Sequence, residues 1–216
     1  MSESRYKLYH YWRSSSSWRV RFALAYKKIP YEAIPVSLLD GESESATHLK
    51  RNPAGLLPVL ELASDQYLTE SLPIIRYLED THPNTPKLFP GTAIDRAKIS
   101  ALAEMINSGI QPLQNIPVFS FHSDDVDEQK RWVRHWIENG LKVYESRLKE
   151  TSGSFSYGND FTLADVCLVP QLYSAERYSI AVSKYPLISR IFANVQAIPA
   201  YLESCPDSFK PLDFKG

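Results

Sequence analysis

The chain has 216 residues, enough for one large domain or two small ones, and its 44% hydrophobic and 23% charged residues are typical of a soluble globular protein. The formal net charge of −1 gives no electrostatic reason to expect a nucleic-acid partner. The apolar stretches are too short to span a membrane, and residues 1–5 lack a hydrophobic signal core, so a cytoplasmic location is expected.

The first 80 residues alternate strand-like and helix-like patterns. Strands are predicted at 7–11, 31–36, 59–62 and 67–68, and helices at about 17–27, 45–51 and 72–80. A turn signal, Asn52-Pro53-Ala54-Gly55, precedes the third strand. The resulting order, β-α-β-α-β-β-α, predicts an α/β domain over residues 1–82.

Three prolines, Pro83, Pro86 and Pro90, interrupt regular structure and predict a linker over residues 83–91. The remainder, 92–216, lacks strand-like alternation and is predicted to be an all-helical domain, with long helices at 93–110 and 128–148.

Four consecutive serines, Ser14 to Ser17, stand between the first strand and the first helix. Hydroxyls there would join the free N–H groups and the positive end of the helix dipole, a combination that stabilises an anion such as a bound thiolate. The alternative is an ordinary helix N-cap with polar neighbours. The spacing alone leaves both interpretations open.

A second helix-start signal lies at Thr162, where the hydroxyl can cap the helix and Asp165 can complete a capping box. Phe161 and Val166 occupy the positions of a hydrophobic staple. Asp165 is therefore predicted to be buried and structural, with a catalytic role as the alternative.

The cysteines and histidines do not predict a metal site. Two cysteines are too few for a metal cluster or a disulfide framework. Cys167 is predicted to be a buried small hydrophobe, and Cys205, before a proline near the C-terminus, to be peripheral. The five histidines show no metal-ligand spacing and are interpreted as surface or core residues.

Several sequence blocks resemble the zeta class of the cytosolic glutathione transferases. The block RSSSSWRVR at 13–21 is similar to the class signature, in which Ser-Ser-Cys precedes Ser-Trp-Arg-Val-Arg. GIQPLQN at 109–115, ADVCLVPQ at 164–171 and AER at 175–177 also match closely. The resemblance covers nearly the whole chain.

This resemblance implies an N-terminal thioredoxin-like α/β domain that binds glutathione, an all-α C-terminal helical bundle domain that binds substrate, and a homodimer. The class includes the enzyme that isomerises maleylacetoacetate to fumarylacetoacetate in tyrosine and phenylalanine catabolism. In that reaction the glutathione thiolate adds to the cis double bond, the resulting single bond rotates, and glutathione leaves with the bond in the trans form.

The resemblance also implies roles for individual residues. The expected catalytic donors are Ser14, Ser15 and Ser16, with Ser15 first among them. The expected glutathione-binding residues are Ser17, Arg19, Leu57, a cis Pro58, Glu70, Ser71, and Gln111 with Asn115 on one helix face. The expected substrate-binding residues are Arg13 and Arg177, whose guanidinium forks suit carboxylates. Arg19 has structural salt bridges as its alternative.

Three positions depart from the class pattern: Ser16 replaces a cysteine, Glu70 replaces the more frequent glutamine, and Pro117 replaces a small polar residue. Because glutathione supplies the sulfur, isomerisation can survive the loss of that cysteine, with reduced or altered activity expected.

Two rival functions use the same residues differently. A general glutathione transferase or dehalogenase would act on small α-halo acids through the same serines and Arg177, and comparing turnover of maleylacetoacetate with that of dichloroacetate separates the two. A non-catalytic transferase-like interaction module would lack the serine cluster or the Glu70–Ser71 pair, both of which are present.

Overall fold

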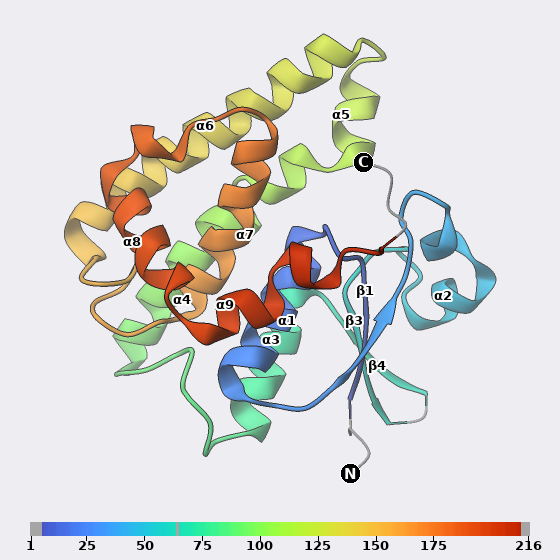
Figure 1. The fold of residues 1–216 in the computed structure, drawn as a ribbon, viewed down its shortest axis with the longest axis horizontal. Coiled ribbons are helices and arrows are strands. Elements are labelled where there is room, and N and C mark those ends of the chain that lie inside the picture. Colours follow the sequence, from blue (N-terminus) through green and yellow to red (C-terminus); the bar gives the residue numbers. More distant parts are fainter. Residues whose placement is uncertain (1–5, 64, 213–216) are drawn as a thin grey trace. The chain divides into compact units, whose positions relative to one another are not determined.

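The computed structural model describes residues 6–63 and 65–212, which divide into two compact units (Figure 1). The first unit contains the chain up to Lys87 together with the chain from Pro199 onward, and the second runs from Leu88 to Ile198. Residues 1–5, whose composition bears on the expected cytoplasmic location, lie outside the described residues.

A four-stranded mixed sheet forms the centre of the first unit. Its strands are β1 (Lys7–His10), β2 (Glu32–Pro35), β3 (Val59–Ala63) and β4 (Gln66–Thr69). The spatial order is β2-β1-β3-β4, with β1 parallel to β2 and antiparallel to β3, and β3 antiparallel to β4. The predicted thioredoxin-like domain is confirmed.

Helices cover both faces of this sheet. Helices α1 (Ser15–Lys27) and α3 (Ser71–Thr81) lie on one side, and α2 (Ala46–Arg51), preceded by the 3₁₀ turn η1 (Glu42–Glu44), lies on the other (Figure 1). Helix α1 begins two residues before the predicted start. Its apolar residues Val20, Phe22 and Leu24 have no exposed surface, which accounts for the close packing of α1 in the core.

The C-terminal segment returns to the first unit as α9 (Pro199–Ser204) and η4 (Pro206–Phe209). The indole N–H of Trp18 donates to Ser204 Oγ at 3.1 Å, and the rings of Trp18 and Tyr201 lie 5.8 Å apart. The predicted boundary instead placed residues 199–216 with the helical domain, because periodicity shows that a helix forms but not where it packs. The same packing buries Cys205, so the prediction of a peripheral cysteine was wrong.

The second unit is built from helices. They are α4 (Ala93–Asn107), η2 (Gln111–Gln114), α5 (Ile116–His122), α6 (Val126–Thr151), α7 (Leu163–Arg177), η3 (Val182–Lys184) and α8 (Pro186–Gln196). Helix α4 packs against α6 and α7, and α6 packs against α8. Residues 82–92, all described, contain no helix or strand. The predicted all-α domain is confirmed as a fold class.

The start of α7 has the predicted capping box. The backbone N–H of Thr162 donates to Asp165 Oδ2 at 2.9 Å, and the N–H of Ser156 donates to Asp165 Oδ1 at 2.8 Å. Burial raises the pKa of the Asp165 carboxyl, although these donors favour its charged form. Cys167, two residues further on, has no exposed surface, as predicted.

The described residues contain no group of histidine, cysteine and acidic side chains that could hold a metal ion. Within the same residues, none of the helices is both long and apolar enough to cross a membrane.

Candidate functional site

The strand register places three predicted site segments at the same end of the sheet's strands. Tyr9 of β1 lies opposite Val59 of β3, and Val59 lies opposite Thr69 of β4. Because β3 is antiparallel to both neighbours, the end of β1, the start of β3 and the end of β4 lie together at that end of the sheet. The serine cluster, Leu57–Pro58 and Glu70–Ser71 follow or precede these strand ends directly.

The serine cluster forms the first turn of α1. Ser14 is the N-cap, and its hydroxyl oxygen accepts the Ser17 N–H at 3.2 Å. The Ser14 N–H donates to Tyr11 O at 3.1 Å. The first N–H groups of a helix have no intrahelical acceptor, so the N–H groups of Ser15 and Ser16 are the remaining donors at this end. The cap is therefore present, and the Ser15 and Ser16 N–H groups remain as donors beyond it.

The four serine side chains differ in burial. Ser14, Ser15 and Ser16 are half-buried. Ser17 has no exposed surface, and its hydroxyl oxygen accepts the Tyr11 N–H at 3.4 Å. A hydroxyl that accepts a cap hydrogen bond keeps its own proton to donate, so Ser14 can cap the helix and still face an anion.

Leu57 and Pro58 are joined by a cis peptide bond, as predicted. The Leu57 side chain is buried in an apolar cluster on one face of the sheet with Tyr11, Trp12 and Val59. This packing fixes the backbone before β3 beside the loop that leads to the serines.

Glu70 and Ser71 form the start of α3. Glu70 is exposed, and its φ of 65° lies in the region that a non-glycine residue rarely adopts. Such a conformation costs about 1–3 kcal/mol and occurs preferentially at functional sites. Ser71 is buried, and its hydroxyl oxygen accepts a hydrogen bond of 3.4 Å from the guanidinium of Arg19, a side chain with no exposed surface. Arg19 thus joins α1 to the first turn of α3.

The segment with Gln111 and Asn115 belongs to the second unit. The prediction that both residues share a face of one α-helix was wrong, because Gln111 begins the 3₁₀ turn η2 and Asn115 is the N-cap position of α5. Pro112 removes an N–H donor and starts this tighter turn. The two side chains nevertheless meet, with Gln111 Nε2 donating to Asn115 Oδ1 at 3.1 Å.

The contacts that stabilise η2 were not predictable from the sequence. Gln114 and Gln171 exchange two amide hydrogen bonds, of 3.1 and 2.9 Å, and the indole N–H of Trp132 donates to Leu113 O at 2.8 Å. Both glutamines lie in the blocks that resemble the zeta class, but a pairing over 57 residues leaves no signal in one sequence.

The two expected substrate-binding arginines lie in different units. The Arg13 guanidinium is 5.4 Å from the ring centroid of Trp12 in the loop before α1. Arg177 is exposed and ends α7. Arg13 directly precedes the N-cap of α1 and Arg177 is the last residue of α7, so both arginines lie at helix ends.

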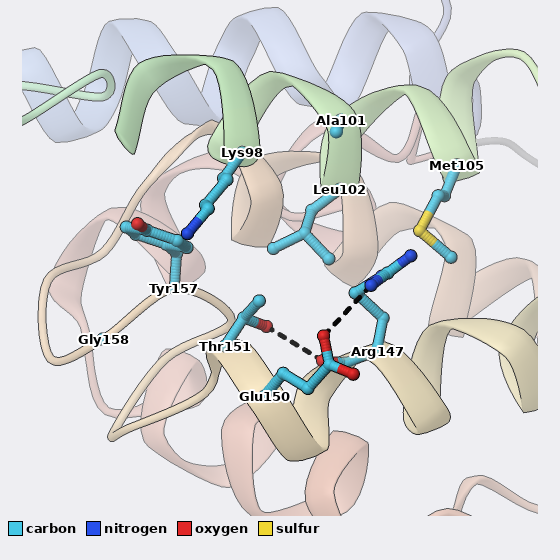
Figure 2. Close-up of a pocket in the computed structure, with 9 residues that line it drawn as sticks. All are labelled: Lys98, Ala101, Leu102, Met105, Arg147, Glu150, Thr151, Tyr157 and Gly158. Carbon is cyan, nitrogen blue, oxygen red and sulfur yellow. Dashed lines mark hydrogen bonds and ion pairs between the residues drawn. The ribbon is translucent and has the colours of Figure 1, made fainter. Parts of the chain in front are cut away.

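A cavity of about 580 Å³ lies within the second unit, between α4, the end of α6 and the loop that follows α6 (Figure 2). Its lining residues are Lys98, Ala101, Leu102, Met105, Arg147, Glu150, Thr151, Tyr157 and Gly158. The Leu102 side chain lies between the side chains of the cations Lys98 and Arg147 (Figure 2). The Arg147 guanidinium forms an ion pair of 3.1 Å with the Glu150 carboxylate. The predicted site residues do not line this cavity.

The thioredoxin-like unit, its cis-proline and the helical second unit together define the glutathione transferase class of fold. Two family models match the chain: the N-terminal domain of glutathione S-transferase over residues 8–86, and the C-terminal domain over residues 114–199.

Curated relatives and solved structures refine this assignment. The chain is 40% identical to maleylacetoacetate isomerase of Dictyostelium discoideum, covering 96% of both chains, and 39% identical to the mouse (Mus musculus) enzyme, covering 92% of this chain and 91% of that one. Maleylacetoacetate isomerase from Anaeromyxobacter dehalogenans 2CP-1 with bound GSH in its active site superposes with a TM-score of 0.87, at 40% identity over 96% of this chain and 97% of that chain.

A bacterial zeta-class maleyl pyruvate isomerase in its holo form superposes with a TM-score of 0.89, at 34% identity over 97% of this chain and 100% of that chain. The chain therefore belongs to the glutathione S-transferase family and, within it, to the zeta class of maleylacetoacetate isomerases that its motifs predicted.

Proposed function

We propose that this chain is a glutathione-dependent cis–trans isomerase that converts maleylacetoacetate to fumarylacetoacetate. The observation that carries the proposal is the first turn of α1, where serine hydroxyls and the N–H groups of Ser15 and Ser16 converge at the positive end of a 13-residue helix. This arrangement stabilises a thiolate without a cysteine of the protein.

The residues of the first unit fit glutathione by their chemistry. The tripeptide carries two carboxylates, an ammonium and a thiol, and so needs anion donors together with one carboxylate. Ser71 at the start of α3 offers a hydroxyl and an N–H to the γ-glutamyl carboxylate, and exposed Glu70 offers a carboxylate to the ammonium. The backbone of Leu57 offers hydrogen bonds to the cysteinyl part. In the second unit, Gln111 and Asn115 offer amides.

When bound, glutathione supplies the sulfur nucleophile that adds to and later leaves the double bond of the substrate. The chain's own residues set the charge on that sulfur: hydrogen bonds from Ser14 or Ser15 favour the thiolate over the thiol, whose pKa is near 8.5 in a free cysteine. Developing negative charge on the substrate requires cationic or N–H donors. We assign its carboxylates to Arg13 and Arg177.

The test is a coupled assay of glutathione-dependent maleylacetoacetate isomerisation with Ser14→Ala and Ser15→Ala variants. The matched control is Ser45→Ala, because Ser45 caps α2 by accepting the His48 N–H at 3.2 Å, as Ser14 caps α1. Each cap loss costs about 1 kcal/mol of stability. We expect both serine-cluster variants to lose activity and Ser45→Ala to keep it; equal activity in all three contradicts the proposal.

The same preparation separates the rival functions. Turnover of dichloroacetate that exceeds turnover of maleylacetoacetate identifies a dehalogenase, and failure to bind immobilised glutathione identifies a non-catalytic module.

Ser16 replaces the class cysteine, so mass spectrometry after alkylation should detect no adduct at position 16. A homodimer and a cytoplasmic location, both implied by the class, complete the proposal, and light scattering and cell fractionation test them.

A further inference from the structure

The guanidinium of Arg21 lies fully buried inside the first unit, in the middle of α1. Its Nε donates to Ser204 O at 3.0 Å, its NH1 to Tyr11 O at 3.3 Å, and its NH2 to Trp12 O at 2.9 Å. NH1 also lies 3.1 Å from His10 Nδ1. One planar group therefore contacts the end of β1, the loop before the serines and the C-terminal segment.

All four acceptors are neutral, and no ion pair joins Arg21 to a carboxylate within the described chain. Burial lowers the pKa of Arg21 to about 10 and, together with the Arg21 charge, lowers the pKa of His10 to about 3. The imidazole is thus neutral, with Nδ1 as the acceptor. A buried charge without a counterion costs several kcal/mol, which a purely structural position would avoid with an apolar side chain.

The contacts of Arg21 lead directly to the serine cluster. Tyr11 O accepts the Arg21 NH1 donor and also the Ser14 N–H, at 3.1 Å. The guanidinium binds two successive carbonyls with different nitrogens, so it fixes the orientation of the Tyr11–Trp12 and Trp12–Arg13 peptides. That orientation sets where the first turn of α1 begins.

The C-terminal segment holds the other side of the guanidinium. The Phe209 ring centroid lies 4.7 Å from Arg21 Cζ and 5.2 Å from the His10 ring centroid. Ser204 accepts from Arg21 through its carbonyl and from Trp18 through its hydroxyl. The return of residues 199–209 to this unit thus completes the environment of Arg21.

We propose that Arg21 is a positioning residue for the reaction: its guanidinium fork, held by the C-terminal segment, orients the Tyr11–Ser14 loop so that the donors of the first turn of α1 meet the thiolate. The inference rests on the proposed function, because it names the residue that orients the same site. Arg21 acts through backbone geometry, and its charge alone does not suffice.

The experiment compares Arg21→Lys, Arg21→Met and Lys27→Met. Arg21→Lys keeps the charge and loses the fork. Lys27→Met removes another buried cation of α1, which pairs with Glu79 at 2.7 Å and does not touch the loop. Thiolate absorbance of bound glutathione, recorded against pH, gives the thiol pKa, and steady-state kinetics gives kcat and KM separately.

We expect both Arg21 variants to raise the thiol pKa by about one unit and to lower kcat about tenfold at neutral pH with a smaller change in KM. Lys27→Met should lower the melting temperature and leave the thiol pKa unchanged. A normal thiol pKa in Arg21→Lys overturns the inference. With a shift in Arg21→Met, the charge rather than the orientation would be what matters, and without one, neither would matter.

Phe209→Leu serves as a milder perturbation if the Arg21 variants do not fold, since it loosens the guanidinium from the C-terminal side and should raise the thiol pKa in the same direction. An unchanged pKa there overturns the inference. Failure of the unaltered protein to lower the thiol pKa overturns the proposed function itself, whereas failure confined to the variants overturns only the role of Arg21.

Discussion

The neutral state of His10 predicts how the stability of the protein depends on pH. The His10 imidazole is buried, its Nδ1 faces the Arg21 guanidinium, and its pKa is lowered from 6.5 to about 3. Above pH 6.5 the ring is neutral in both the folded and the unfolded chain and contributes no pH dependence. Below pH 6.5 only the unfolded chain binds the proton, so acid favours unfolding through this residue.

The magnitude follows from the difference between the two pKa values. Each pH unit between 6.5 and about 3 lowers the free energy of unfolding by about 1.4 kcal/mol, which gives about 2 kcal/mol at pH 5 and about 5 kcal/mol near pH 3. Carboxylates that titrate in the same acid range add their own contributions, so the comparison needs a variant that differs at this position alone.

Urea unfolding of the natural chain and of His10→Asn at pH 5, 6, 7 and 8 isolates the contribution of His10. Asparagine keeps an acceptor for Arg21 and does not titrate. The stability difference between the two proteins should change by about 2 kcal/mol between pH 8 and pH 5, to the disadvantage of the natural chain. Parallel curves, or an NMR titration of the His10 ring near pH 6.5, would show that burial does not lower the His10 pKa in the folded chain.

Three further substitutions test which contacts stabilise the second unit. Asp165→Ala should lower the free energy of unfolding by about 2–5 kcal/mol, because it leaves buried N–H donors without an acceptor. The control is Asp95→Ala in the exposed capping box of α4, which should lower the free energy of unfolding much less. Equal losses of stability for the two variants in denaturant unfolding would contradict this. Gly140→Ala should cost about 1–3 kcal/mol, because a Cβ there overlaps the Ile110 side chain. Since Ile110 directly precedes Gln111, that variant should also raise the KM for glutathione, and an unchanged KM would count against the role of Gln111.

The fold was predictable where the local pattern carries the information. Strand alternation and the Thr162–Asp165 capping signal each predicted an element or a helix start within a few residues of the structure. The start of α1 was predicted two residues too late, although a serine cap before an apolar run is a local signal. Both interpretations of the four serines proved compatible, since Ser14 accepts the cap hydrogen bond and retains its own proton.

The remaining features depend on contacts between segments that are distant in sequence. Neither the packing of α9 on Trp18 nor the burial of Cys205 changes the periodicity of residues 199–209. No sequence pattern distinguishes Arg21 from the other cations of its helix, and only the fold shows that it donates to three backbone carbonyls and faces His10. The 3₁₀ geometry at Gln111–Gln114 was missed because i and i+4 spacing was assumed across Pro112, which favours a tighter turn.

We propose that the first turn of α1 makes the thiol of bound glutathione anionic. A spectroscopic pH titration of glutathione bound to the natural chain, with Ser14→Ala and Ser15→Ala in parallel, measures this directly. We expect a thiol pKa clearly below that of free glutathione in the natural chain, and a return toward the free value in the variants. A bound thiol that ionises at the same pH as the free tripeptide would contradict it.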